Sequence, residues 1–245
     1  MNQSTISFAL GKIGILEKTL VSPSLLEEIV KLNLEEVLLK LKDTFLYQEA
    51  LKKRDIYWEE IFIREEKMLK EICQQLLPQE ESREFFQRVE SPQSLRELIP
   101  KSGKYQKDLK EFIEFYLIIL DILNFLRIKA YQLKEEYYLD RDKFRLPQDL
   151  EKKIFFAFNP KTKVFFQEAE EILKREKNYL LHFLMRKYLV EFWEEKKREL
   201  LSSGIIFWFY FAKKLNLEVI KCIMGALDYS LDREKVKEVI KVVYG

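Results

Sequence analysis

Apolar residues recur every three or four positions along most of the chain, which is the spacing of one face of an α-helix. This pattern predicts long helices over Arg54–Leu77, Lys104–Lys134, Thr162–Leu201 and Gly204–Leu227. Polar and apolar residues do not alternate with a period of two over a useful length, so we expect no substantial sheet. The predicted fold class is therefore all-α.

Shorter helices are predicted from residues that suit a helix start. A serine, an asparagine or an aspartate can accept a hydrogen bond from the backbone N–H groups of a first turn. Such residues stand before three apolar stretches, at Ser22, Asn33 and Asp232. Pro23 strengthens the first of these predictions because proline is favoured at the first helical position. A further helix is expected over Ile6–Leu20.

The order of the predicted helices indicates a weak internal repeat, in which a long apolar helix leads through a loop to a short helix. The repeat-like units cover residues 1–53, 104–160 and 202–245, with connecting segments at 54–103 and 161–201. We expect them to form a single all-helical domain over residues 1–245. Gln79–Gly103, which contains Pro92 and Pro100, is the expected place for a mobile connection.

Composition narrows the class of protein. The chain has 245 residues, 47% of them hydrophobic, and its 43 basic and 41 acidic side chains leave a net charge of only +2. This balance gives the whole molecule no attraction to nucleic acid. Cys73 and Cys222 lie inside helical patterns and no secretory signal is visible, so we expect free thiols and a cytoplasmic location.

No segment is long enough to be predicted as a transmembrane helix, which needs about 20 predominantly apolar residues. The longest uncharged stretch, Leu200–Ala212, is followed directly by Lys213 and Lys214. The aromatic composition of Ile205–Lys214 suits either a core or an interface, and we expect a core. Contact with a membrane is therefore expected only through a partner.

Candidate catalytic and metal-ligating groups are scarce. The single histidine, His182, has no glutamate three residues before it and is expected to be a surface or boundary residue. No Cys-x-x-Cys or His-x-x-x-His spacing predicts a metal site. Ser102–Tyr105 resembles part of a phosphate-binding loop but lacks its second glycine and its Ser/Thr. We therefore expect no catalytic residue, no cofactor and no metal.

An apolar stretch in the middle of the chain carries three polar residues at steps of three, Asp121, Asn124 and Arg127. We call them the polar row. Burial of such groups is unfavourable unless they are paired. The row is expected either to face an interior between repeats or to form a satisfied cluster within the core, and in neither case to carry chemistry.

Segments at both ends of the chain resemble one known family. Ala9–Leu51 contains Leu38, Leu41, Asp43, Thr44 and Tyr47 in a frame similar to its L-x-x-L-x-D-T-x-Y pattern. Gly204–Ile240 contains Ala212-Lys213, with Lys221 and Gly225 near a basic residue and a glycine of the family. The chain departs from the pattern at Lys214, where the family has an acid, and at Val219, where it has an asparagine. On these residues the chain resembles the C subunits of the V-type (A-type) rotary ATPases, which are related to the d subunits of the eukaryotic vacuolar enzyme.

The resemblance implies a mechanical role. Asp121, Asn124, Arg127 and Lys129 match the frame of the family's repeat helix, and the family's repeats have approximate threefold symmetry around a central funnel. The implied function is a non-catalytic central-stalk component that links the central shaft to the membrane rotor ring and couples ATP turnover to ion translocation. The transported ion, H⁺ or Na⁺, stays open. The residues implied at partner interfaces or in a structural polar row are Asp121, Asn124, Arg127, Lys129, Lys213, Lys214 and Lys221.

Two other classes of function are compatible with the sequence. The first is a cytoplasmic helical adaptor or scaffold that binds a partner helix. The second is a nucleic-acid-binding protein that uses basic clusters such as Lys52–Arg54 and Lys196–Arg198. Acidic residues beside each cluster argue against the second class, so no nucleic-acid partner is expected.

Overall fold

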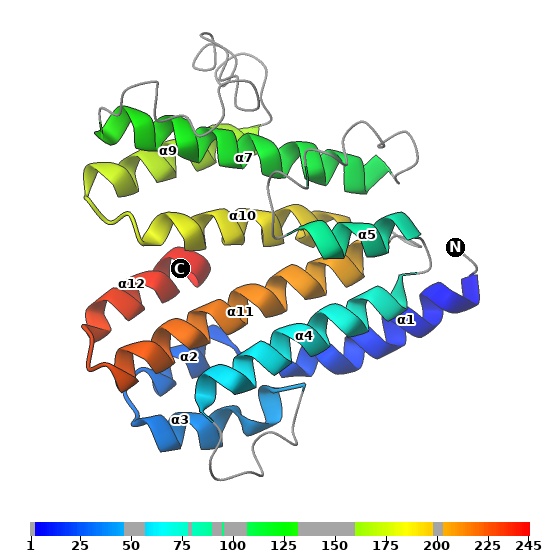
Figure 1. Ribbon diagram of the computed structural model, residues 1–245, viewed down its shortest axis with the longest axis horizontal. Helices are drawn as coiled ribbons and strands as arrows, with labels where there is room; N and C mark the ends of the chain where they lie inside the picture. The colour runs from blue at the N-terminus through cyan, green and yellow to red at the C-terminus, as the bar shows by residue number, and fades with distance from the viewer. Residues whose placement is uncertain are drawn as a thin grey trace. The chain divides into compact units, whose positions relative to one another are not determined.

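The structure is a computed structural model that describes residues 3–46, 57–77, 80–89, 95, 107–131, 160–197 and 203–245 (Figure 1). These residues form helices joined by turns, and no strand occurs among them, which confirms the all-α prediction. The chain divides into two compact units, one formed by Met1–Glu90 with Leu189–Gly245 and the other by Ser91–Tyr188. A single domain with repeats around a funnel stays a prediction.

The first unit brings both ends of the chain together. Its N-terminal segment contains α1 (Gln3–Leu16), η1 (Glu17–Thr19), α2 (Pro23–Ile29), α3 (Leu34–Leu41), η2 (Lys42–Thr44), α4 (Trp58–Leu76) and α5 (Glu80–Arg88). Its C-terminal segment contains the last part of α10 (Leu180–Lys196), α11 (Gly204–Asp228) and α12 (Arg233–Tyr244).

Helices α4 and α11 run side by side in opposite directions (Figure 1). Trp58, at the start of α4, donates from Nε1 to Asp228 Oδ2 at the end of α11, 3.1 Å away. Farther along α4, Glu66 pairs with Lys221, which lies closer to the start of α11. Helix α4 thus belongs to the core of the unit, although it falls in the segment that the sequence led us to expect as a connection.

The expected mobile connection over Gln79–Gly103 is wrong for α5. The rings of Phe85 and Phe86 are fully buried. Both pack against Phe207 of α11, with ring centroids 5.5 Å and 5.3 Å from it. Two adjacent aromatic residues on a short helix bury enough apolar surface to hold that helix in place.

All three predicted capping residues begin helices. Ser22 accepts a hydrogen bond from the Leu25 N–H, with Pro23 in the first turn of α2. Asn33 and Glu36 form a reciprocal capping box at the start of α3. Asp232 accepts from the Glu234 N–H at the start of α12. These local signals are confirmed.

The second unit contains α7 (Lys107–Tyr131), α9 (Pro160–Lys174) and the first part of α10. The ring of Phe125 lies 6.4 Å from that of Phe166, and Lys129 Nζ lies 3.8 Å from Glu170 Oε1. Because these contacts follow the same order along both helices, α7 and α9 are parallel. The short helix expected near Asp140 lies outside the described residues.

The single long helix predicted over Thr162–Leu201 is wrong, because α9 ends at Lys174 and α10 begins at Leu180. Glu176 adopts a left-handed conformation with φ of 57°. The Lys177 N–H donates to the Ile172 carbonyl and the Glu176 N–H to the Leu173 carbonyl, which is the hydrogen-bond pattern of a Schellman C-cap. Glycine usually occupies this position, so the glutamate gave no sequence signal of the helix end.

No described helix combines the length and the apolar character of a transmembrane segment. Helices α7 and α11, at 25 residues each, are long enough to cross a hydrocarbon core. Neither contains a stretch apolar enough to cross a membrane, and no other described helix is both long enough and apolar enough.

Candidate functional site

Helix α11 carries polar side chains into the interior of the first unit. Most of the helix is apolar, and the rings expected to form a core in Ile205–Lys214 are buried. Among them, Lys213 is 1% exposed and Asn216 is 3% exposed. Polar groups at such depth require partners, and both residues find them in the N-terminal segment.

Lys213 is held by three other elements of the unit. Its ammonium nitrogen lies 3.5 Å from Oε1 of Glu65 on α4, and the Glu65 side chain is fully buried. The same nitrogen donates to the Thr19 carbonyl of η1 at 2.8 Å and to the Thr44 carbonyl of η2. Glu65 Oε1 also accepts from the Leu46 N–H at 2.7 Å. The Lys213–Glu65 pair therefore supplies hydrogen-bond partners to the Thr19 and Thr44 carbonyls and to the Leu46 N–H, and its two charges offset each other.

Burial changes the proton affinity of Lys213. Removal from water lowers its pKa from 10.5 to about 8, and the negative charge of Glu65 and a hydrogen bond to it offset part of this shift. An amine with such a pKa can be a nucleophile. At 1% exposure no reagent reaches it, so we interpret the pair as a structural connection.

The lowered pKa of Lys213 predicts that stability rises with pH. Between pH 8 and 10.5 the unfolded chain binds this proton and the folded chain releases it, so the free energy of unfolding increases through this window. From about pH 7 to about pH 9, Lys213 should contribute a rise of about 1 kcal/mol. Urea unfolding of the wild type and of a Glu65→Leu/Lys213→Met variant measures it as a difference.

A difference between the two proteins is needed because other buried groups change the stability in the opposite direction. Burial raises the pKa of the Cys73 thiol and raises that of Tyr244 to about 12, so each stabilises the fold less as pH rises above its unfolded pKa. Both groups are present in the two proteins and cancel. An identical pH dependence for wild type and variant would contradict the prediction.

Asn216 makes a second connection between the chain ends. Its Oδ1 accepts from the Val21 N–H at 2.6 Å, and its Nδ2 donates to the Val21 carbonyl at 3.1 Å. Nδ2 also donates to the Tyr244 hydroxyl of α12 at 2.7 Å. Desolvation raises the pKa of Tyr244, and the hydrogen bond from Asn216 offsets only part of this rise. Asn216 thus joins the start of α2 to the end of α12.

The remaining lysines of the predicted site have different surroundings. Lys221 pairs with Glu66, each about one-third exposed, and lies 5.7 Å from the centroid of the Phe62 ring. Lys214 is 8% exposed. Lys213 and Lys214, which the resemblance implied at a partner interface or in a structural polar row, are thus both buried, and Lys213 is enclosed by α4 and the N-terminal turns.

The polar row on α7 is not a buried cluster. Asp121 and Asn124 are half-buried, whereas Arg127 is exposed. Each step of three residues rotates a side chain by about 60° around the helix, so Arg127 lies well away from Asp121. The expectation of a row buried in the interior is corrected at Arg127. Lys129 is also exposed and pairs with Glu170 of α9.

A groove between α2 and α12 contains lysines that reasoning from the sequence missed. It has a volume of about 490 Å³ and is lined by Pro23, Glu27, Lys31, Lys237, Ile240, Lys241, Tyr244 and Gly245. The spacing of Lys237 and Lys241, one helical turn apart, was the available signal. Nothing in the sequence placed Lys31 opposite them.

Neither the side chains of the described residues nor the comparisons with known proteins assign a function. Among the residues that the structure describes, no group of three or more histidine, cysteine, aspartate or glutamate side chains could hold a metal ion. Comparisons of the chain with protein-family models, with curated proteins and with solved structures find no match.

Proposed function

We propose that this protein is a non-catalytic central-stalk component of a rotary ATPase of the V/A type. In this role it joins the central shaft to the membrane rotor ring and couples ATP turnover to ion translocation. The protein would act on the cytoplasmic side, touch the membrane only through the ring and need no cofactor.

The observation that carries this proposal is the contact between Lys213 and Thr44. Lys213 belongs to the Ala-Lys match in the C-terminal segment, and Thr44 belongs to the Asp-Thr match in the N-terminal segment. Although 169 positions separate them, the lysine donates a hydrogen bond to the threonine carbonyl. The two segments that carry the resemblance thus fold against each other, as expected if they are parts of one family motif.

The construction of the first unit suits a part that transmits force. Helices α4 and α11 are connected near one end by Trp58 and Asp228, and farther along by Glu66 with Lys221 and by Glu65 with Lys213. Close-packed interiors deform little under load. A component between a shaft and a ring needs such stiffness more than it needs a reactive group.

Purification of the tagged protein from native membranes tests the proposal. We expect shaft and rotor-ring proteins of one ATPase to copurify, and we expect calorimetry of the isolated protein to detect no ATP binding. Copurification of an unrelated protein alone, or saturable binding of ATP, would contradict the proposal.

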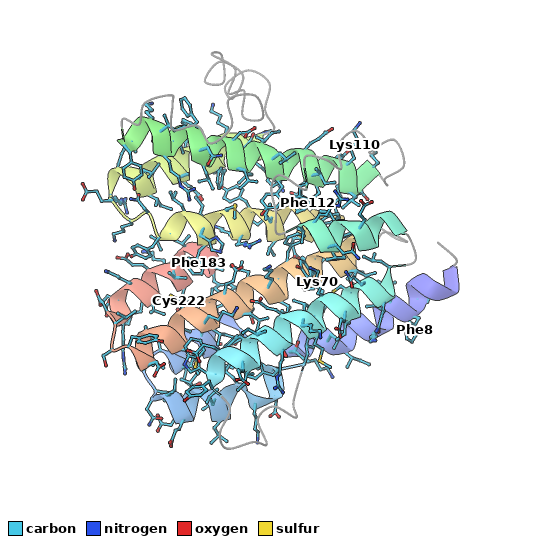
Figure 2. The ribbon with its side chains drawn as sticks, in the orientation of Figure 1. Phe8, Lys70, Lys110, Phe112, Phe183 and Cys222 are labelled. Atoms are coloured by element: carbon cyan, nitrogen blue, oxygen red, sulfur yellow. The ribbon has the colours of Figure 1, made fainter. Side chains whose placement is uncertain are left out.

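A helical adaptor that binds a partner helix is the second candidate, and α1 favours it. Phe8 and Ile15 are 66% and 70% exposed and lie two turns apart on one face of α1. Figure 2 shows Phe8 on the outer side of the helix. In the same purification, an adaptor would bring down its partner without proteins of an ATPase.

A further inference from the structure

We propose that the groove between α2 and α12, lined by Lys31, Lys237 and Lys241, binds an acidic segment of a partner protein. The proposal rests on charge and geometry within the first unit alone. It holds whether or not the chain belongs to a rotary ATPase.

The groove has an excess of positive charge. Its lining includes the three lysines and one carboxylate side chain, that of Glu27. Lys237 pairs with Glu234 on the surface of α12, and that lysine remains 52% exposed. The Lys31 and Lys241 side chains are exposed, and neither forms an ion pair among the described residues. Two charges of the groove are therefore available to an anionic partner.

The fold gives these lysines no internal role. The other lysines placed around α11 are buried or half-buried and have partners, as Lys213 does with Glu65 and Lys221 with Glu66. Lys31 and Lys241 are instead exposed on opposite sides of a cavity. Like charges gathered around a cavity attract a ligand of opposite charge and speed its association.

The shape of the groove selects a polypeptide segment. The lining positions on the α2 side, Pro23, Glu27 and Lys31, follow one another at steps of four and extend over about 12 Å. Ile240 and Tyr244 of α12 add apolar groups to the lining. Such a trough suits a short segment with carboxylates at its edges and an aliphatic side chain toward its floor.

A simple phosphate site is less consistent with these residues. Phosphate is commonly bound by backbone N–H groups at a helix N-terminus. Here Ser22 already caps α2, and Pro23 at its first turn has no N–H to donate. The groove also lacks arginine, whose planar fork binds phosphate through paired hydrogen bonds.

Fluorescence anisotropy with a labelled probe tests the inference. The probe is a helical peptide of about 15 residues with Glu at turn-spaced positions and Leu between them. A second peptide replaces every Glu by Gln. We expect the full-length protein to bind the Glu peptide at low salt, at least about tenfold more tightly than the Gln peptide, with affinity falling as salt rises.

Reversal of the lysine charges in the groove tests whether the peptide binds there. Lys31→Glu/Lys241→Glu should weaken binding at least about tenfold. The control Lys18→Glu/Lys163→Glu makes the same change in net charge at exposed lysines outside the groove and should alter affinity less than about twofold. All four side chains are exposed, so both variants should keep the wild-type circular dichroism spectrum and urea midpoint.

Three results would overturn the inference. The first is an equal loss of affinity in the groove and control variants, which would indicate nonspecific attraction. The second is equal binding of the Glu and Gln peptides, or no binding of either. The third is displacement of the Glu peptide by millimolar inorganic phosphate, which would identify a site for small anions instead.

Discussion

Replacement of Glu65 by leucine is expected to lower the free energy of unfolding by about 3–5 kcal/mol, because it leaves a buried lysine without its counter-charge. Lys213 is 1% exposed and cannot recover water by a side-chain rotation. The Leu46 N–H loses its acceptor as well. Urea unfolding followed by tryptophan fluorescence measures the effect on the first unit alone, because Trp58, Trp193 and Trp208 all belong to it.

The adjacent glutamate supplies a matched control. Glu66 pairs with Lys221, but both side chains are about one-third exposed. A pair that water can reach contributes little, so Glu66→Leu should lower the free energy of unfolding by no more than about 1 kcal/mol. Similar losses for Glu65→Leu and Glu66→Leu would show that burial of the Lys213 pair has no special importance.

The double variant Glu65→Leu/Lys213→Met separates the penalty for an unpaired charge from the net value of the pair. Removal of both charges should recover part of the loss, since apolar residues of similar volume often replace a buried ion pair with little penalty. Recovery should be incomplete. The Thr19 and Thr44 carbonyls lose the donor that Lys213 provides, and an unsatisfied buried group costs about 1–3 kcal/mol.

The helices and their starts could be predicted because their signals are local. Ser22, Asn33 and Asp232 accept hydrogen bonds from residues two or three positions away. Every part of such a cap lies within one short stretch of sequence. The end of α9 was missed for a related reason, because its left-handed residue is Glu176 and not the usual glycine.

The polar interior could not be predicted because its partners are distant in the chain. Asn216 binds the backbone of Val21, 195 positions away. A lysine that ends an uncharged aromatic stretch is equally consistent with the edge of a buried segment and with a surface contact. Only the fold, which places Glu65 and two backbone carbonyls around Lys213, decides between these interpretations.

The case of the polar row is the reverse of the case of Lys213. Polar residues inside an apolar stretch suggested a buried cluster, which the structure does not contain at these positions. The pattern identified α7 correctly as a helix with a broad apolar face. Asp121, Asn124 and Arg127 lie at its edge or outside it, because steps of three rotate progressively around a helix of 3.6 residues per turn. The angle around the helix between Asp121 and Arg127, two steps of about 60° each, could have predicted this difference in exposure from the sequence.

Replacement of Phe207 by alanine is the second change expected to have a large effect, a loss of about 3–5 kcal/mol in the free energy of unfolding. Phe207 is 1% exposed, and its ring stacks on Trp193 with centroids 4.5 Å apart and on Phe86 with centroids 5.3 Å apart. Alanine would leave a cavity where α5, α10 and α11 meet.

The size of the side chain, rather than its exact shape, should account for most of this loss. Phe207→Leu fills more of the cavity and should cost less than Phe207→Ala. Phe8→Ala removes the same ring from a residue that is 66% exposed, so it should change the free energy of unfolding by no more than about 0.5 kcal/mol. Tryptophan fluorescence is again the measurement, since Trp193 lies directly on the altered ring. If Phe207→Ala proves as mild as Phe8→Ala, the aromatic stack does not stabilise the first unit, and the segment Glu80–Arg88 is held there by other contacts.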